Sequence, residues 1–117
     1  NGIWIMKIYH NPRCSKSRQT LKILETENIK FQIINYIKTG VTIKEIYEII
    51  SKLKVDPINI VRTQEKVWKT EYNKNMKEKD IINSIIKHPI LLERPIVLTE
   101  EKGIIGRPPE NVQHLIN

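Results

Sequence analysis

The only cysteine of this 117-residue chain, Cys14, lies in a polar turn that is well placed for nucleophilic chemistry. The apolar run Ile5–Tyr9 predicts a short strand, and a helical periodicity begins at about Ser15. Cys14 therefore falls at the start of a helix, where free N–H groups and the positive end of the dipole favour an anion. Four basic side chains lie within four residues of it and act in the same direction: His10, Arg13, Lys16 and Arg18.

A lowered pKa would change what this thiol can do. A thiol with a pKa near 8.5 is about 3% ionised at pH 7, whereas one with a pKa of about 6.5 is about 75% ionised. The alternative is a structural cysteine, because free cysteine is among the residues most often buried. The residues on both sides of Cys14 show no apolar periodicity. The pattern therefore favours a nucleophilic thiolate over a core residue.

The chain has few arginines, and their positions suggest that they act together near Cys14. Only five of the 20 basic residues are Arg, and the rest are Lys. The arginines lie near Cys14 or at the heads of segments that could return to it: Arg13, Arg18, Arg62, Arg94 and Arg107. The planar guanidinium fork holds a tetrahedral oxyanion in a way that Lys cannot copy. The alternative for each is a solvated surface arginine or a surface salt bridge.

Composition narrows the class of protein. The length fits one domain, residues 1–117, and no apolar run approaches the roughly 20 residues of a membrane span. The net charge of +7 comes from scattered lysines without a basic tract or interleaved aromatics, so nucleic acid is not expected as a partner. A single cysteine and three scattered histidines give no metal-site spacing. A chain without disulfides fits the reducing cytoplasm.

The periodicity predicts an α/β fold. A strand, a helix and a second strand at Phe31–Tyr36 form a βαβ unit with a parallel strand pair, and ligands gather at the carboxyl ends of such strands. Helices are expected in a segment at about residues 42–88, opened by the capping box Thr42-Ile43-Lys44-Glu45. A third strand at Pro95–Leu98, a fourth at Ile104–Gly106 and a last helix from Pro108 complete the chain.

Three motifs together resemble the glutaredoxin-linked arsenate reductase family, the ArsC type. They are the H-N-P-x-C-x-x-S-R string at residues 10–18, Arg94-Pro95, and G-R-P-P at residues 106–109. The resemblance begins at about Met6, so residues 1–5 are either a native extension or cloning residues. It implies a thioredoxin-like fold with a four-stranded mixed sheet, βαβ then ββα, and a helical insertion between strands 2 and 3.

The resemblance also assigns roles to individual residues. Cys14 matches the catalytic cysteine, and His10 matches the histidine credited with lowering its pKa, although a histidine bonded to the loop backbone is the alternative. Ser17 and Arg18 match the end of the N-terminal motif, and Pro95 matches the cis proline that faces the active cysteine. Three arginines match those that bind the oxyanion: Arg62, Arg94 and Arg107.

The activity implied by the resemblance is reduction of arsenate to arsenite, and the expected ligand is arsenate or a similar oxyanion. Glutathione acts as co-substrate and glutaredoxin as protein partner, and no bound cofactor or metal is required. Ser17 stands where a C-x-x-C protein has its second cysteine, so turnover must use an external thiol. Two alternatives stay open: an Spx-like regulator that binds RNA polymerase, and a thiol transferase of the same fold with another substrate. The sequence gives no oligomeric state.

Overall fold

The computed structural model describes residues 6–116, so the expectation for residues 1–5 lies outside the described residues. The chain forms two compact units, and each is described by itself. The first contains the chain up to Thr39 and again from Arg94 onward, and the second is Gly40–Glu93. The helical insertion expected at about residues 42–88 coincides with the second unit. That the whole chain is one domain stays a prediction.

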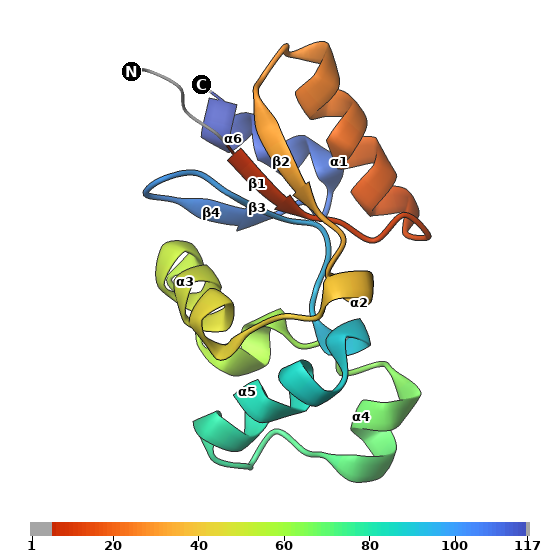
Figure 1. Cartoon of the computed structure of the whole chain (residues 1–117). Helices are drawn as coiled ribbons and strands as arrows, with labels where there is room; N and C mark the ends of the chain where they lie inside the picture. Colours follow the sequence, from red (N-terminus) through yellow and green to blue (C-terminus); the bar gives the residue numbers. More distant parts are fainter. Residues whose placement is uncertain (1–5, 117) are drawn as a thin grey trace. The chain divides into compact units, whose positions relative to one another are not determined.

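The first unit is built on a four-stranded mixed sheet with the strand order β2-β1-β3-β4 (Figure 1). Its strands are β1 (Met6–Tyr9), β2 (Phe31–Ile34), β3 (Ile96–Leu98) and β4 (Gly103–Ile105). Strand β1 pairs in parallel with β2 and antiparallel with β3, and β3 pairs antiparallel with β4. The predicted βαβ then ββα arrangement is confirmed.

Helix α1 (Ser15–Thr26) makes the crossover between the two parallel strands, which cannot be joined by a tight turn. It ends next to Asn28, whose φ of 58° is the left-handed conformation that Asn tolerates better than most residues. Because β1 and β2 run in the same direction, their carboxyl ends share one edge of the sheet. Helix α1 begins at that edge, which places Cys14 there.

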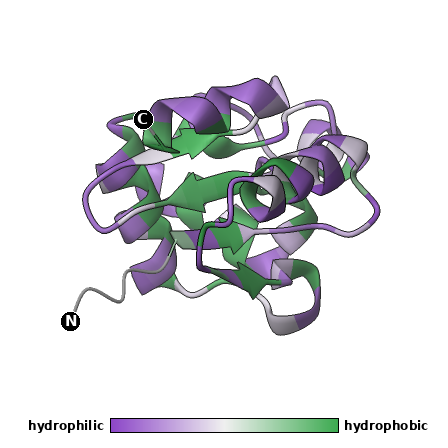
Figure 2. Ribbon diagram, turned by 90° about the horizontal axis from the view of Figure 1, so that it is seen from above, coloured by the Kyte–Doolittle hydropathy of each residue, from purple (hydrophilic) through white to green (hydrophobic). Residues whose placement is uncertain are grey.

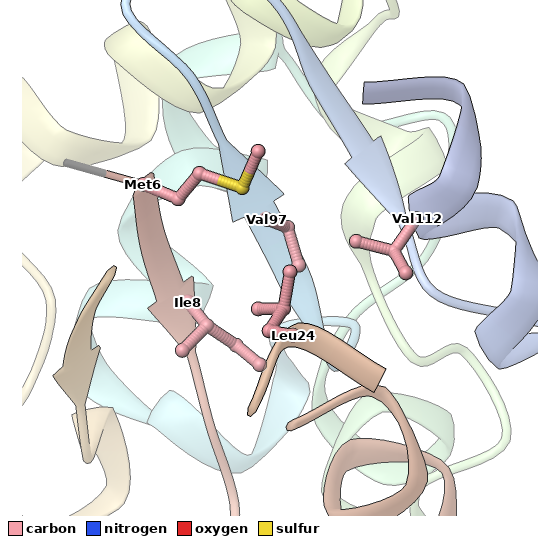
Figure 3. Packing of buried hydrophobic residues seen from close by; sticks show 5 residues of the cluster. All are labelled: Met6, Ile8, Leu24, Val97 and Val112. Atoms are coloured by element: carbon pink, nitrogen blue, oxygen red, sulfur yellow. The ribbon is translucent and has the colours of Figure 1, made fainter. Parts of the chain in front are cut away.

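The core of the first unit lies between the sheet and the helical segments that cover one of its faces. Figure 3 shows five buried side chains converging there from β1, α1, β3 and the 3₁₀ helix η3 (Pro109–Val112): Met6, Ile8, Leu24, Val97 and Val112. Figure 2 shows the same division, with hydrophobic strands and helices that are hydrophilic over much of their surface. Burial of this apolar surface fixes the sheet beneath α1 and therefore the position of the Cys14 turn.

Four predicted elements of this unit have different bounds. The third strand begins at Ile96 rather than Pro95, and the fourth spans Gly103–Ile105 rather than Ile104–Gly106. The second strand ends at Ile34 because the chain turns into α2 (Tyr36–Thr39), where the Tyr36 ring is fully buried. The helix predicted from Pro108 is a 3₁₀ turn, η3, followed by the short helix α6 (Gln113–Ile116). Proline at the first positions fits either kind of helix, so the sequence could not separate them.

The second unit is helical. Its elements are α3 (Ile43–Leu53), η1 (Pro57–Ile60), α4 (Lys66–Glu71), α5 (Glu78–Lys87) and η2 (Pro89–Leu91). The capping box predicted at Thr42 and Glu45 is confirmed, with side-chain bonds of 3.1 and 2.9 Å in the two directions. Among the described residues, no helix has the length and apolar character needed to cross a membrane.

Candidate functional site

Cys14 occupies the N-cap position of α1, which is usually taken by Ser, Thr, Asp or Asn. Its backbone is extended, with φ −94° and ψ 121°, and the residue is 8% exposed. The side chain makes no conventional cap hydrogen bond, but the N–H groups of Lys16 and Ser17 face the sulfur and favour its charged form. An ionised Cys14 therefore takes the place of the capping oxygen at this helix.

Two arginines from the far end of the sequence surround the same sulfur. The Nη2 of Arg107 donates to Cys14 Sγ at 3.5 Å, and its Nε donates to the Arg94 carbonyl at 2.8 Å. The Arg94 side chain also donates a hydrogen bond to the thiol. The fold thus brings Arg94 and Arg107 to Cys14, from which they are 80 and 93 residues away in sequence. A guanidinium pair beside a nucleophile is an arrangement that binds an oxyanion.

The surroundings of Cys14 lower its pKa. Burial acts in the opposite direction and is the largest single effect, because it raises the pKa of a thiol. It is outweighed by the Ser17 N–H, the Arg94 side chain, the Lys16 N–H and the positive charge of Arg107, which together bring the pKa of Cys14 below its usual value. The site therefore holds a larger fraction of the thiol as thiolate than an ordinary cysteine has at the same pH.

The lowered pKa predicts the pH dependence of alkylation. Because only the thiolate reacts, the rate of iodoacetamide labelling should rise with pH through the lowered pKa of Cys14 and level off before an ordinary thiol has ionised. As pH falls through the same value, the rate should fall. Glutathione, labelled under the same conditions, is the control. A midpoint at or above about 8.5 would contradict the electrostatic argument.

His10 acts on the site through Ser17. Its Nδ1 lies 2.6 Å from Ser17 Oγ, and that oxygen accepts the Asn11 N–H at 3.1 Å. Burial first, and then the charge of Arg18, lower the pKa of His10, so the neutral imidazole predominates at pH 7. Ser17 Oγ thus makes two hydrogen bonds, and the direction of the one to His10 is set by the tautomer of the imidazole. This network holds the loop against the first turn of α1, and the backbone N–H of Ser17 is left to face the sulfur.

The rest of the loop is held by local hydrogen bonds. Asn11 Oδ1 accepts the Arg13 N–H at 3.0 Å, the turn geometry expected of Asn at such a position. Arg18 Nη1 donates to the Pro12 carbonyl at 2.8 Å, which ties the exposed Arg18 side chain back to the loop. Arg18 therefore supports the loop and contributes positive charge near His10.

The two arginine-bearing segments are joined close to α1. The Arg94–Pro95 peptide bond is cis, as the resemblance implies, and Arg107–Pro108 is also cis, which the sequence analysis did not anticipate. Gly106 N–H donates to the Pro95 carbonyl at 2.8 Å. A Cβ at Gly106 would lie 2.6 Å from Thr20 Oγ1 and 2.8 Å from Pro95 Cγ. Both neighbours are stiff, so Gly106 is the residue that lets these three segments meet.

Gly106→Ala should therefore disturb the site as well as the packing. We expect an overpacking cost of about 1–3 kcal/mol and a rise in the Cys14 pKa, because the loop that carries Arg107 must move away from α1. The measurements are denaturant unfolding and the pH dependence of alkylation. Gly40→Ala is the control: it is strained by its φ of 78° but has open space around it. Adding Thr20→Ala removes the closest clash, so the double variant should regain part of the lost stability and its Cys14 pKa should move part of the way back to the wild-type value.

If Gly106→Ala left the alkylation midpoint unchanged, or if Gly40→Ala moved it equally, the close contact would have no role in positioning Arg107. Gly106 is part of the G-R-P-P motif, but the sequence assigned no role to it or to Thr20. The Thr20 side chain is fully buried, and its Oγ1 has no hydrogen-bond partner among the described atoms. Only the three-dimensional contact reveals why glycine is needed there.

Arg62 belongs to the second unit, and its surroundings there are acidic. Its Nε lies 3.1 Å from Glu65 Oε2 and its Nη1 lies 3.3 Å from Glu93 Oε1. The guanidinium is thus shared between two partly exposed carboxylates. To hold an oxyanion it would have to exchange at least one of them. The oxyanion roles of Arg62, Arg94 and Arg107 all stay predictions; Arg94 and Arg107 lie in the same unit as Cys14.

Comparison with known proteins places these features in a family. A sequence profile of the ArsC family matches residues 9–115. A protein named arsenate reductase from Haemophilus influenzae is 38% identical, with 93% of this chain and 97% of that protein aligned. One of the same name from Neisseria meningitidis is 37% identical over 95% of this chain and 97% of its own.

The solved structures agree with the sequence comparison. The structure of an arsenate reductase from Vibrio cholerae superimposes with a TM-score of 0.89 at 33% identity, covering 95% of this chain and 97% of that one. The matched segment of the profile includes Cys14 and both arginines that contact it. The chain therefore belongs to the ArsC family of thioredoxin-like proteins.

Proposed function

We propose that this protein reduces arsenate to arsenite, with Cys14 as nucleophile and with glutathione and glutaredoxin as external thiol donors. The observation that carries the proposal is the guanidinium of Arg107, 3.5 Å from a sulfur whose pKa is lowered. A thiolate and an arsenate dianion repel each other, at about 4 kcal/mol per unit charge pair at 4 Å and an effective dielectric constant of 20. Arg94 and Arg107 supply the charge that offsets this repulsion.

The proposed first step forms a bond between Cys14 Sγ and arsenic. The thiolate attacks the arsenic atom, an As–O bond breaks, and the oxygen leaves as water after taking up protons. Arsenic is still in the +5 state in this adduct. The N–H groups at the start of α1 and the two guanidinium groups stabilise the negative charge that gathers on the oxygens.

The electrons must come from outside the chain. Overall, arsenate and two thiols give arsenite, one disulfide and water, which transfers two electrons to arsenic. Since Cys14 is the only cysteine and is regenerated, both thiols are external. Glutathione first forms an As–S bond to the adduct and a second oxygen leaves as water, with arsenic still at +5. The glutaredoxin thiolate then attacks the glutathione sulfur, an S–S bond forms, and the As–S electron pair stays on arsenic, which becomes +3. Water then displaces the Cys14 sulfur, and arsenite leaves. Ser17 carries no sulfur, so it cannot form an internal disulfide with Cys14; its hydroxyl is instead hydrogen-bonded to His10 and to the Asn11 N–H.

The test is arsenate-dependent oxidation of glutathione by the purified protein in the presence of glutaredoxin, glutathione reductase and NADPH. Reductant consumption should require both arsenate and the protein, and arsenite should appear in equal amount. Consumption that does not depend on arsenate would instead identify a thiol transferase. Absence of any turnover, together with capture of RNA polymerase by the protein, would favour the regulator.

A further inference from the structure

The first turn of α1 carries charges of the sign that a helix N-terminus ordinarily avoids. Acidic residues are favoured there, yet this turn contains none. Lys16 and Arg18 stand at its second and fourth positions, and Arg13 precedes the cap. No acidic residue occurs anywhere between Met6 and Leu24. Basic residues in the first turn of a helix bring no structural stabilisation, and such an unfavourable placement is typical of a functional surface.

These cations divide into two groups by what they contact. Arg94 and Arg107 act on the Cys14 sulfur directly. The side chains of Arg13 and Lys16 are exposed on either side of Cys14 in sequence. Neither forms an ion pair with a carboxylate in the part of the chain that the structure describes. Their charge is therefore presented to molecules arriving from solvent.

We propose that Arg13 and Lys16 form a reductant-selecting rim, which favours low-molecular-weight thiols that carry carboxylates over neutral or cationic thiols. This rests on the proposed function, because it names the kind of thiol that reaches the Cys14 adduct. The arsenate-binding charges lie on Arg94 and Arg107, so the rim serves a later step than oxyanion binding. Glutathione, with two carboxylates and one ammonium group, has the required net negative charge.

The rim acts through long-range attraction. Each exposed cation raises the local concentration of an anionic thiol by a factor that is largest at low ionic strength. Two such charges about 7 Å from the incoming thiol give a preference of about three- to tenfold. The preference should vanish in about 0.5 M salt, where the Debye length is only a few ångströms. A shape-based preference would survive such salt.

The experiment uses a mixed disulfide between Cys14 and thionitrobenzoate, so neither arsenate nor arsenate turnover enters it. An added thiolate forms a new S–S bond with Cys14 Sγ, the existing S–S bond breaks, and thionitrobenzoate leaves with the electron pair and is measured by its absorbance. The probes are glutathione, 2-mercaptoethanol and cysteamine, compared per unit of thiolate. Their rates on free Ellman's reagent give the intrinsic reactivity of each thiol.

The wild-type protein should favour glutathione over cysteamine by about three- to tenfold beyond the intrinsic ratio. Arg13→Ala with Lys16→Ala should abolish that excess, and Lys16→Glu should reverse part of it. The conservative variant Lys16→Arg should keep it. Lys22→Ala is the matched control, because Lys22 is exposed on the same helix and about 9 Å further from the N-terminus.

An unchanged ratio in the double variant would overturn the proposal, and so would an equal loss in Lys22→Ala. Lys16→Glu offers an independent measurement, because an acidic residue in the first turn should raise the melting temperature while the selectivity is lost. If the melting temperature and the thiol selectivity of Lys16→Glu both fell, Lys16 would have a merely structural role. If the protein did not reduce arsenate but still preferred anionic thiols, the proposed function would be wrong while the role of Arg13 and Lys16 would stand.

Discussion

Cys14→Ser is expected to abolish arsenate-dependent turnover, by at least about a thousandfold. A serine hydroxyl is not ionised by the surroundings that ionise the thiol, and its oxygen cannot be released from arsenic by thiol exchange. The same change should leave stability equal or slightly higher, because Cys14 occupies an N-cap and Ser is among the preferred residues there. Turnover is measured as arsenite formed, and stability by denaturant unfolding.

The pairing of these two results makes the variant informative. A fall in both activity and stability would show that Cys14 is a packing residue, which its 8% exposure alone would allow. Ser15→Ala is the matched control, since Ser15 is exposed at the next position of the helix. It should turn over arsenate at the wild-type rate. Arsenate reduction by the Cys14→Ser protein would end the proposed mechanism.

Arg107→Ala should lower arsenate turnover by about a hundredfold or more, the loss typical of removing a donor that stabilises developing negative charge. It removes the Nη2 contact with Sγ and the Nε bond to the Arg94 carbonyl in one step. Because a positive charge next to the thiolate is lost, the Cys14 pKa should also rise toward its usual value. Alkylation should still occur at higher pH, since the thiol itself is intact.

Two matched variants separate charge from geometry. Arg107→Lys keeps the charge but cannot contact the sulfur and the Arg94 carbonyl through a planar fork, so it should restore the pKa better than the turnover. Lys102→Ala, at an exposed cation on the β3–β4 turn, should change neither. Normal turnover by Arg107→Ala would show that Arg107 is not an oxyanion ligand. Arg94→Ala is expected to behave as Arg107→Ala does.

Local signals predicted the parts of the fold that depend on near neighbours. The capping box at Thr42 and Glu45 is set by residues within a few positions of each other. The four-stranded sheet followed from apolar runs and from the βαβ rule. Where distant residues decide, prediction failed: the second strand is shorter than predicted because Tyr36 turns into the interior.

The same limit applies to amphipathic helices and to the site. The helical spacing of Ile43 and Tyr47 relative to Ile46 and Ile49 predicts that they are buried, yet they are 50% and 54% exposed, because periodicity places an apolar stripe on a helix but does not set the width of the buried face. In the site, residue types and motifs pointed to Cys14 and to Arg94 and Arg107, whereas the hydrogen bonds from His10 through Ser17 to the loop backbone depend on the three-dimensional structure. The close approach of Gly106 to Thr20 is likewise invisible in a one-dimensional pattern.

The site combines residues from the two ends of the chain, with Gly40–Glu93 between them in sequence. A nascent polypeptide that has left the ribosome only as far as Glu93 contains the thiol but neither of the guanidinium groups that sensitise it. Its sulfur is then governed by the loop and by α1 alone. The part of the pKa lowering that comes from Arg94 and Arg107 is therefore acquired only after both have been synthesised and β3 has paired with β1.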